Sequence, residues 1–356
     1  MKAAVLYGAR DMRLEDRPVP TFGDDEVLLK VAACGVCGSD VHYFAHGRIG
    51  DQVVESPMPV GHEVSAFVAD FGSAVEGLEK GQRVAVDPAR PCGACEQCLH
   101  GRQNCCPNVR FFGTPPVDGT FQEYYAVSPR QCIPIPANMT MAEAAFLEPL
   151  LVGVHANNMV PTRPGESCVI IGAGPIGLSC MLMAKASGAS PLIVTDKLDY
   201  RLDLAAKMGA VHTINVTKDE PAEAIQDITG GGAHCLFDCT NTSEGLPQAI
   251  ASGRIGSRVA WVGITGEDTI TIEPHVARRK QLLIQLIRRS VHGFPQGLRL
   301  MADGIIDVKP MITHHLPLAR IHEAFDMVEH YADGVVKAMI HLAQEDADRP
   351  STVRRN

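Results

Sequence analysis

The alternation of hydrophobic and polar residues changes character about halfway along the chain. Before residue 155, short β-type runs such as 26–34 (EVLLKVAAC), 64–72 (VSAFVADFG) and 82–88 (QRVAVDP) alternate with segments rich in glycine and proline. Short apolar runs bounded by turn residues are typical of β-strands joined by loops. We therefore predict that this first region is all-β with long loops.

From about residue 167, apolar strand-type runs are separated by helix-type runs. The strand-type runs are 168–172 (CVIIG), 191–196 (PLIVTD), 211–215 (VHTIN), 235–240 (CLFDCT), 258–264 (RVAWVGI) and 282–288 (LLIQLIR). Strands that alternate with helices form a parallel sheet wound on both faces. We predict an α/β protein in which a doubly wound parallel sheet follows the β-rich region.

Two further features complete the predicted organisation. After residue 290, helical patterns at 297–304 and 321–331 lead to a final β-type run at 335–343, and the polar segment 345–356 looks like a frayed tail. At ~100–200 residues per domain, a chain of 356 residues suggests about two domains. We place the domains at 1–155 and 156–289, with 290–356 returning to the first domain.

Composition and charge exclude several classes of protein. The chain is 46% hydrophobic and 21% charged, which is ordinary globular usage. Its formal charge is −9, and no cluster of Lys and Arg suggests a nucleic-acid partner. The longest uncharged run, 167–184, has several glycines and a proline, so it predicts a strand, a turn and a helix start rather than a membrane span. Charges near the N-terminus argue against a signal peptide, and we expect a soluble cytoplasmic protein.

A glycine motif follows the first strand of the predicted parallel sheet. Residues 172–177 (GAGPIG) fit the pattern Gly-x-Gly-x-x-Gly between a strand and a helix, the context of a dinucleotide site. Gly172 permits the tight turn, Gly174 lets the backbone approach a pyrophosphate, and Gly177 lets helix and strand pack closely. Asp196 ends the next strand, where a carboxylate accepts hydrogen bonds from ribose hydroxyls and repels a 2′-phosphate.

Two cations that follow Asp196 do not reverse its preference for a cofactor without a 2′-phosphate. Lys197 and Arg201 lie close to Asp196 in the sequence, and we expect Arg201 to contact the ribose. The predicted cofactor is therefore NAD rather than NADP.

The cysteines are clustered rather than spread along the chain. Five of the twelve lie between residues 92 and 106: Cys92, Cys95, Cys98, Cys105 and Cys106. Four thiolates in one short loop make a closed tetrahedral zinc site with a structural role. The spacing leaves open whether Cys105 or Cys106 is the fourth ligand. A nucleic-acid zinc ribbon is the competing interpretation, but no basic and aromatic patch flanks the loop.

A second metal site is predicted from separate segments. Cys37 lies in 34–43 (CGVCGSDVHY), His62 lies in the triplet Gly-His-Glu, and Glu148 precedes a proline at the entry to the dinucleotide half. A catalytic zinc needs three protein ligands and one exchangeable position. Cys37, His62 and one carboxylate, either Glu63 or Glu148, meet that need.

These motifs together resemble the zinc-dependent medium-chain dehydrogenase/reductase superfamily over nearly the whole chain. Segments 41–54 (VHYFAHGRIGDQVV), 57–63 (PMPVGHE) and 111–127 (FFGTPPVDGTFQEYYAV) are most similar to those of sorbitol (polyol) dehydrogenases. The resemblance implies a GroES-like β-rich catalytic domain interrupted by a Rossmann domain, with the active site between them. It implies NAD and two zinc ions per chain, one catalytic and one structural.

The resemblance also implies roles for individual residues. The catalytic zinc would be held by Cys37 and His62. Glu63 would either bind the zinc or contact its ligands, and Glu148 would either bind the zinc or hydrogen-bond to the water on it. The structural zinc would be held by Cys92, Cys95, Cys98 and Cys106. Cofactor contacts would come from Gly172, Gly174, Pro175, Ile176, Gly177, Asp196, Arg201, Val262, Gly263 and Ile264. Substrate hydroxyls would be bound by Tyr43, Glu148 and Arg289, and protons would leave through Ser39 and His42, with Glu148 or a water as the alternative base.

The expected activity is reversible oxidation of a secondary hydroxyl of a polyol of the sorbitol or xylitol type to a ketose. Sorbitol dehydrogenases typically have an aromatic residue after the substrate arginine, whereas Ser290 follows Arg289 here. Arg288 also offers an alternative placement for that arginine. An L-idonate or other sugar-acid 5-dehydrogenase, a threonine or general alcohol dehydrogenase, and a zinc-binding protein without turnover are the alternatives. A dimer or tetramer is expected, because the edge strand at 282–288 could pair across an interface.

Overall fold

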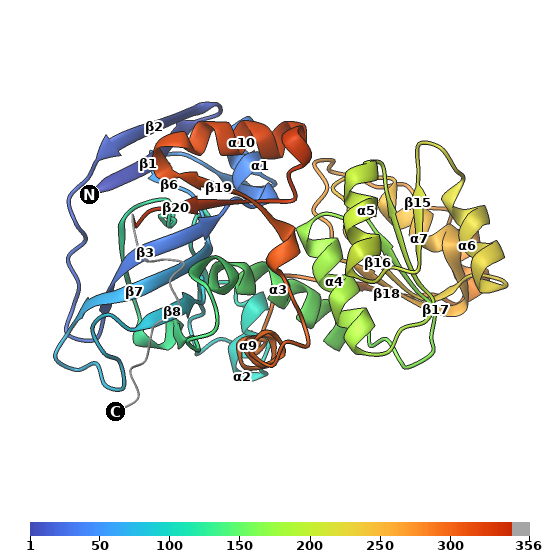
Figure 1. Ribbon diagram of the computed structural model, residues 1–356, viewed down its shortest axis with the longest axis horizontal. Helices are drawn as coiled ribbons and strands as arrows, with labels where there is room; N and C mark the ends of the chain where they lie inside the picture. The colour runs from blue at the N-terminus through green and yellow to red at the C-terminus, as the bar shows by residue number, and fades with distance from the viewer. Residues whose placement is uncertain (344–356) are drawn as a thin grey trace. The chain divides into compact units, whose positions relative to one another are not determined.

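A computed structural model describes residues 1–343, so the predicted polar tail at 345–356 lies outside the described residues. The chain forms two compact units (Figure 1). The first unit comprises residues 1–148 and the segment that returns at residue 312, and the second comprises residues 149–311. The long insertion of the second unit into the first agrees with a catalytic region interrupted by a dinucleotide region.

The boundaries between the units differ from those predicted at 155/156 and 289/290. Helix α3 (Met141–Met159) runs through residue 155 without a break, and the units divide inside it. Helix α9 (Phe294–Ala302) belongs to the second unit. Asn158 of α3 donates a hydrogen bond of 3.1 Å to Gln296 of α9. The segment 290–311 therefore packs with the second unit before the chain returns to the first.

The first unit is built on a seven-stranded mixed sheet (Figure 1). Along the sheet the order is β12-β8-β7-β3-β20-β19, and β11 pairs with β3. Its strands are β3 (Val27–Gly35), β7 (Glu63–Phe71), β8 (Arg83–Val86), β11 (Tyr124–Val127), β12 (Cys132–Pro134), β19 (Ile312–Pro317) and β20 (Lys337–His341). Strand β3 pairs antiparallel with β7 and with β20, so the returning segment contributes to the centre of the sheet.

Smaller sheets and short helices surround it. A three-stranded sheet joins β1 (Lys2–Gly8), β2 (Asp11–Asp16) and β6 (Met58–Pro59), and two hairpins join β4 (Arg48–Ile49) to β5 (Gln52–Val53) and β9 (Ala89–Arg90) to β10 (Arg110–Phe111). The helices of this unit besides α3 are α1 (Gly38–His46), α2 (Glu96–Leu99) and α10 (Ile321–His330).

The prediction of an all-β first region was wrong for α1, α2 and α3. Helix α1 begins after Cys37, whose backbone N–H donates a hydrogen bond of 3.0 Å to the Asp40 carboxylate, and it ends at Gly47. An acid in the first turn is favourable because it accepts unpaired backbone donors and faces the positive end of the helix dipole. Helix α3 has 19 residues, but within residues 1–343 no helix combines the length and the apolar character that a bilayer span requires.

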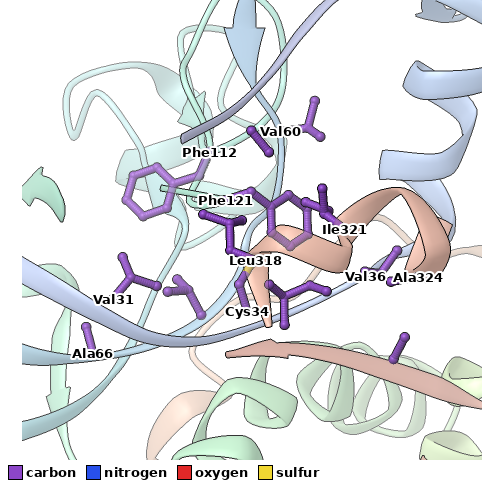
Figure 2. Packing of buried hydrophobic residues seen from close by; sticks show 14 of the residues in the cluster. Val31, Cys34, Val36, Val60, Ala66, Phe112, Phe121, Leu318, Ile321 and Ala324 are labelled. Atoms are coloured by element: carbon purple, nitrogen blue, oxygen red, sulfur yellow. The ribbon is translucent and has the colours of Figure 1, made fainter. Parts of the chain in front are cut away.

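The core of the first unit lies between the sheet and the returning helix (Figure 2). Phe121 is fully buried, and its ring meets the ring of Phe325 edge to face at a centroid distance of 5.7 Å. Figure 2 shows Phe121 beside Leu318 and Ile321 of the returning segment, with Cys34 of β3 nearby. Residues far apart in the sequence therefore share one hydrophobic core.

The second unit is a six-stranded parallel sheet in the order β15-β14-β13-β16-β17-β18, as the sequence predicts. Its strands are β13 (Cys168–Ile171), β14 (Leu192–Asp196), β15 (His212–Asn215), β16 (Ala233–Asp238), β17 (Gly253–Trp261) and β18 (Leu283–Leu286). Besides α9, its helices are α4 (Pro175–Ala186), α5 (Asp199–Met208), α6 (Pro221–Thr229), α7 (Gly245–Ser252) and α8 (Pro274–Lys280). The strand order reverses between β13 and β16, which defines the crevice where doubly wound folds bind dinucleotides.

Truncation of Phe121 tests the shared core of the first unit. Because the ring is fully buried, Phe121→Ala should lower the free energy of unfolding by about 3–5 kcal/mol. Urea unfolding followed by circular dichroism measures this. The control is Leu14→Ala in β2, where the side chain is 41% exposed and the change should stay within about 0.5 kcal/mol. Equal losses in the two variants would contradict this description of the core.

Candidate functional site

Three predicted metal ligands meet at one end of the central sheet of the first unit. One ligand atom each from Cys37, His62 and Glu63 lies within 4.8 Å of the others. Cys37 stands just before α1, which follows β3, and Glu63 is the first residue of β7. Gly35 pairs with Glu63 across the two strands, so the register of the sheet brings the segments together.

Asp40 joins these segments and was given no role from the sequence. It is fully buried, and its Oδ2 accepts the hydrogen bond from Cys37 N, while its Oδ1 accepts one of 3.0 Å from Gly61 N. The same Oδ1 lies 3.4 Å from Nδ1 of His62. A carboxylate that accepts a hydrogen bond from one ring nitrogen of a histidine orients the ring. The other ring nitrogen is then available to bind a metal. The signal in the sequence was an acid three residues after Cys37.

The electrostatics of His62 fit a site prepared for a cation. Burial alone would lower the pKa of His62, but the negative charges of Asp40 and Cys37 outweigh it and raise that pKa well above its ordinary value. The pocket therefore favours positive charge at this ring. A metal ion bound there would compete with a proton on His62, because an imidazole ligand must be neutral.

Glu63 has a buried partner that the sequence analysis also missed. Both carboxylate oxygens of Glu63 accept hydrogen bonds from Nζ of Lys337, at 2.6 and 2.7 Å, and both side chains are almost completely buried. Gly35 makes room for this carboxylate, because a Cβ atom there would lie 2.0 Å from Oε2 of Glu63. A single lysine inside the apolar run 335–340 was the available signal, since an isolated charge in a buried strand needs a partner.

Glu148 lies outside the three-residue ligand cluster. Its carboxyl group interacts electrostatically with His62, Glu63 and Lys337. Desolvation raises the pKa of Glu148 to about 7, with a smaller contribution from the charge of Glu63. The sequence left open which glutamate completes the ligand set, and the structure brings Glu63 into it. Glu148 can exchange a proton near neutral pH.

The donor atoms of this cluster suit zinc. A thiolate sulfur, an imidazole nitrogen and a carboxylate oxygen are the ligand types that zinc binds, and three protein ligands leave one position for a substrate or water. Cys37 and His62 are also candidates for mutual hydrogen bonding, which shows how closely the donors converge. The residues present therefore fit a catalytic zinc ion.

Helix α1 carries the other residues predicted to act in this unit. Ser39 and His42 are half-buried and lie one helical turn apart. Tyr43 is 3% exposed, packs in the hydrophobic core, and donates a hydrogen bond of 3.2 Å from its hydroxyl to Gln52. Its ring is therefore fixed in the core of the first unit.

The cysteine loop gathers four sulfurs. The ligand atoms of Cys92, Cys95, Cys98 and Cys106 all lie within 4.8 Å of one another, whereas the neighbouring Cys105 is exposed and stands outside the group. Backbone N–H groups of Ala94 and Cys95 donate to Cys92 and lower the pKa of its thiol to about 6. Four converging sulfurs, one of them a stabilised thiolate, fit a closed tetrahedral zinc site.

The predicted dinucleotide residues of the second unit gather at the carboxyl ends of its strands. Residues 172–177 link β13 to α4, and a Cβ atom on Gly177 would lie 1.8 Å from the carbonyl oxygen of Gly172, so only glycine fits this approach of helix to turn. Pro175 and Ile176 form the first turn of α4. Oδ2 of Asp196 accepts a hydrogen bond of 2.7 Å from Ala173 N, which holds the acid against the turn.

Two further parts of the predicted cofactor set lie close by. A Cβ atom on Gly174 would stand 3.8 Å from the guanidinium of Arg201, so this cation borders the glycine turn. Val262 and Gly263 follow β17, and their N–H groups donate to the carbonyl oxygen of Asp238 at the end of β16. Ile264 is 55% exposed. The strand order reverses at a crevice of the sheet, which is bordered by the glycine turn 172–177, by Asp196 and by the segment 262–264.

The arginine doublet follows β18. Arg288 is exposed and Arg289 is half-buried, with a positive φ of 53° at Arg289. The difference in burial favours Arg289 as the residue that can reach a ligand within its own unit.

Comparisons with known proteins identify the family to which the chain belongs. Residues 23–137 match the alcohol dehydrogenase GroES-like domain, and residues 175–303 match the zinc-binding dehydrogenase family. Sorbitol dehydrogenase of Bacillus subtilis is 39% identical over 96% of this chain and 97% of its own length. Sorbitol dehydrogenase of Homo sapiens is 37% identical over 90% and 91%.

Solved structures extend the comparison. An oxidoreductase of unknown specificity from Escherichia coli superposes with a TM-score of 0.91 at 31% identity, covering 96% of this chain and 99% of its own. L-idonate 5-dehydrogenase from E. coli superposes with a TM-score of 0.86 at 27% identity, covering 96% and 98%. The chain belongs to the zinc-dependent medium-chain dehydrogenase/reductase superfamily and is similar to its sorbitol dehydrogenases over almost its whole length. It is therefore an enzyme of the zinc- and nicotinamide-dependent class.

Replacement of one cysteine in the loop tests the structural metal. Cys95→Ser should remove one zinc ion per chain and lower the free energy of unfolding by about 3–5 kcal/mol, because structural zinc contributes directly to folding. Elemental analysis and urea unfolding measure the two effects. Cys105→Ser is the matched control, since it changes the adjacent cysteine outside the cluster and should alter neither quantity. A stable Cys95→Ser variant with its full metal content would refute the assignment.

Proposed function

We propose that this enzyme oxidises a secondary hydroxyl of a polyol to a ketose, reversibly, with NAD as the hydride acceptor. The observation that carries the proposal is the similarity to sorbitol dehydrogenases over nearly the whole chain, together with an unbroken set of metal-ligating residues. Hydride transfer is the chemistry of the cofactor, while the protein supplies binding and alignment.

In this proposal Cys37, His62 and Glu63 hold a catalytic zinc ion and Asp40 orients His62. Zinc bound there would act as a Lewis acid that makes the substrate hydroxyl more acidic. Cys92, Cys95, Cys98 and Cys106 hold a second, structural zinc ion, which gives two per chain. Cys37, Glu63 and Asp40 are negative when ionised, so this pocket favours a divalent cation.

Removal of the hydroxyl proton is assigned to residues of the first unit. Ser39 and His42 form the proposed path to solvent, and burial lowers the pKa of His42, which keeps its imidazole neutral and able to accept a proton. Glu148 is the alternative base, because a pKa of about 7 matches the pH at which general bases are most effective.

Substrate hydroxyls beyond the reacting one would be bound by Tyr43, Glu148 and Arg289. A pocket that pairs with hydroxyls rejects analogues that lack them, because its own polar groups are then left without partners. A second candidate, oxidation of an L-idonate-type sugar acid, is supported by the similar L-idonate 5-dehydrogenase and by two adjacent arginines that suit a carboxylate.

Two further parts of the proposal concern the setting of the enzyme. A cytoplasmic location is proposed because thiolate ligands need a reducing compartment. A homodimer or homotetramer is proposed because Leu283 and Leu286 of β18 are 56% and 63% exposed at the edge of the parallel sheet.

Cofactor preference is tested at Asp196. We expect at least about ten-fold higher kcat/KM with NAD than with NADP, or about 1.4 kcal/mol, because the carboxylate repels a 2′-phosphate. Asp196→Ala should reduce the difference in kcat/KM between NAD and NADP, since Lys197 and Arg201 are then available to the 2′-phosphate. Initial rates at the nicotinamide absorbance band measure both. Equal use of the two cofactors by the unaltered enzyme would contradict the assignment.

Substrate class is tested with one panel of polyols, sugar acids and simple alcohols. The kcat/KM with sorbitol, xylitol or a related polyol should exceed that with ethanol or 2-propanol by about 10⁴-fold. A simple alcohol would leave polar groups of the pocket without hydrogen-bond partners, and ratios of this size follow from that. Arg289→Ala should lower kcat/KM with polyols far more than with simple alcohols. Arg288→Ala is the control, and it should not change this preference. Strong activity on L-idonate with little on polyols would favour the second candidate, and preference for simple alcohols would refute the polyol pocket.

A further inference from the structure

We propose that Lys337 is a positioning residue of the catalytic metal site, where its ammonium group holds the Glu63 carboxylate in place and balances the charge of the pocket. This inference rests on the metal site proposed above and adds to it a residue contributed by the returning C-terminal segment. Lys337 is not one of the three residues of the ligand cluster, and it acts through Glu63.

The hydrogen bonds of Lys337 are complete without any further partner. Its ammonium carries three N–H donors, and three acceptors surround it: Oε1 and Oε2 of Glu63, and the carbonyl oxygen of Val36 at 3.0 Å. Lysine and glutamate are 2% and 0% exposed, so water does not compete for these bonds. A buried ion pair of this kind persists only when its geometry satisfies both partners.

Lys337 also fixes the residue that precedes a second proposed ligand, Cys37. The carbonyl oxygen of Val36 accepts the hydrogen bond from Lys337, and the N–H of Val36 donates a hydrogen bond of 2.9 Å to the carbonyl oxygen of Ala338. Both backbone polar groups of Val36 are therefore held by β20. Glu63 and Cys37 belong to different segments, and Lys337 sets the positions of both.

Charge balance gives the lysine a second role. With a divalent cation in the pocket, the positive charges are two on the metal and one on Lys337. The acidic groups nearest to the site are Cys37, Asp40 and Glu63, and Glu148 also interacts electrostatically with Lys337. The ammonium of Lys337 therefore offsets part of the negative charge that these groups carry when ionised. Without Lys337 this desolvated pocket would be more negative, which opposes the loss of a proton from a bound hydroxyl.

Three variants separate this role from simple stability. Lys337→Met removes the charge, and Lys337→Arg keeps a cation. Gly35→Ala leaves the lysine intact but drives a methyl group against Oε2 of Glu63, so it displaces the carboxylate by another route. Lys280→Met is the matched control, because Lys280 is also a partly buried ammonium, bonded to the carbonyl oxygens of Ile250 and Ala251 in the other unit.

Each protein is assayed for zinc content, for the visible spectrum after replacement of the exchangeable zinc by Co²⁺, and for kcat and KM with the best polyol. Lys337→Met should shift the Co²⁺ bands and lower kcat about 10–100-fold with a much smaller change in KM, as for other residues that orient metal ligands. Lys337→Arg should restore part of kcat. Gly35→Ala should shift the same bands, and Lys280→Met should resemble the unaltered enzyme.

The outcomes distinguish this inference from the proposed function. An unchanged Co²⁺ spectrum and kcat in Lys337→Met, in an enzyme that holds two metal ions per chain, would overturn the role of Lys337 and leave the metal site standing. Failure of Lys337→Arg to exceed Lys337→Met in kcat would also overturn it. If Lys337→Met does not fold, Lys337→Gln takes its place in both comparisons, because it removes the charge but keeps a hydrogen-bond donor. An unaltered enzyme that binds only the metal of the cysteine loop would overturn the metal site, and this inference with it.

Discussion

The pairing of β3 with both β7 and β20 is the constraint on which the catalytic chemistry of the first unit depends. It sets Gly35 opposite Glu63 on one side and opposite Met339 on the other, so three distant segments meet at one end of the sheet. A slip of one residue in either pairing would turn the side chains of that strand to the opposite face of the sheet. Glu63 would then leave the cluster, or Lys337 would leave Glu63. Packing of Phe121 against the returning segment stabilises this register through the hydrophobic core.

Burial of charged groups near the ligand cluster explains why Asp40 and Glu63 both have polar or charged partners. Asp40 and Glu63 are fully buried, and an isolated ionised carboxylate in such a place would be neutralised by a shift of its pKa. Asp40 instead accepts two backbone hydrogen bonds and faces His62, and Glu63 faces Lys337. Glu148 forms no ion pair within residues 1–343, and desolvation raises its pKa to about 7. The pocket thus combines fixed charges that suit a metal ion with one carboxyl group that can exchange a proton near neutral pH.

What could be predicted from the sequence depends on how local the physical cause is. The six parallel strands follow from apolar runs separated by helical patterns, and the cysteine loop follows from spacing within fifteen residues, so both were readable. Helix α1 was not, because its start depends on one hydrogen bond from Cys37 to Asp40 in a segment that otherwise resembles a loop. The pairing of Glu63 with Lys337 spans 274 positions, and no local pattern encodes it. The boundaries at 155 and 290 were misplaced because helix α3 crosses the division and α9 packs on its far half.

The two proposed metal sites therefore differ in how they relate to folding. The four cysteines at 92–106 lie in one loop, so a metal ion could gather them with little help from the rest of the chain. The set Cys37, His62 and Glu63 exists only when β3 and β7 are paired in register, and Lys337 reaches it only after β20 has joined the sheet. Binding of a cation at the second site thus draws on the free energy of the whole first unit. The same dependence places its ligands with a precision that a single loop does not provide, because side chains on a rigid sheet vary less in position than those on a loop.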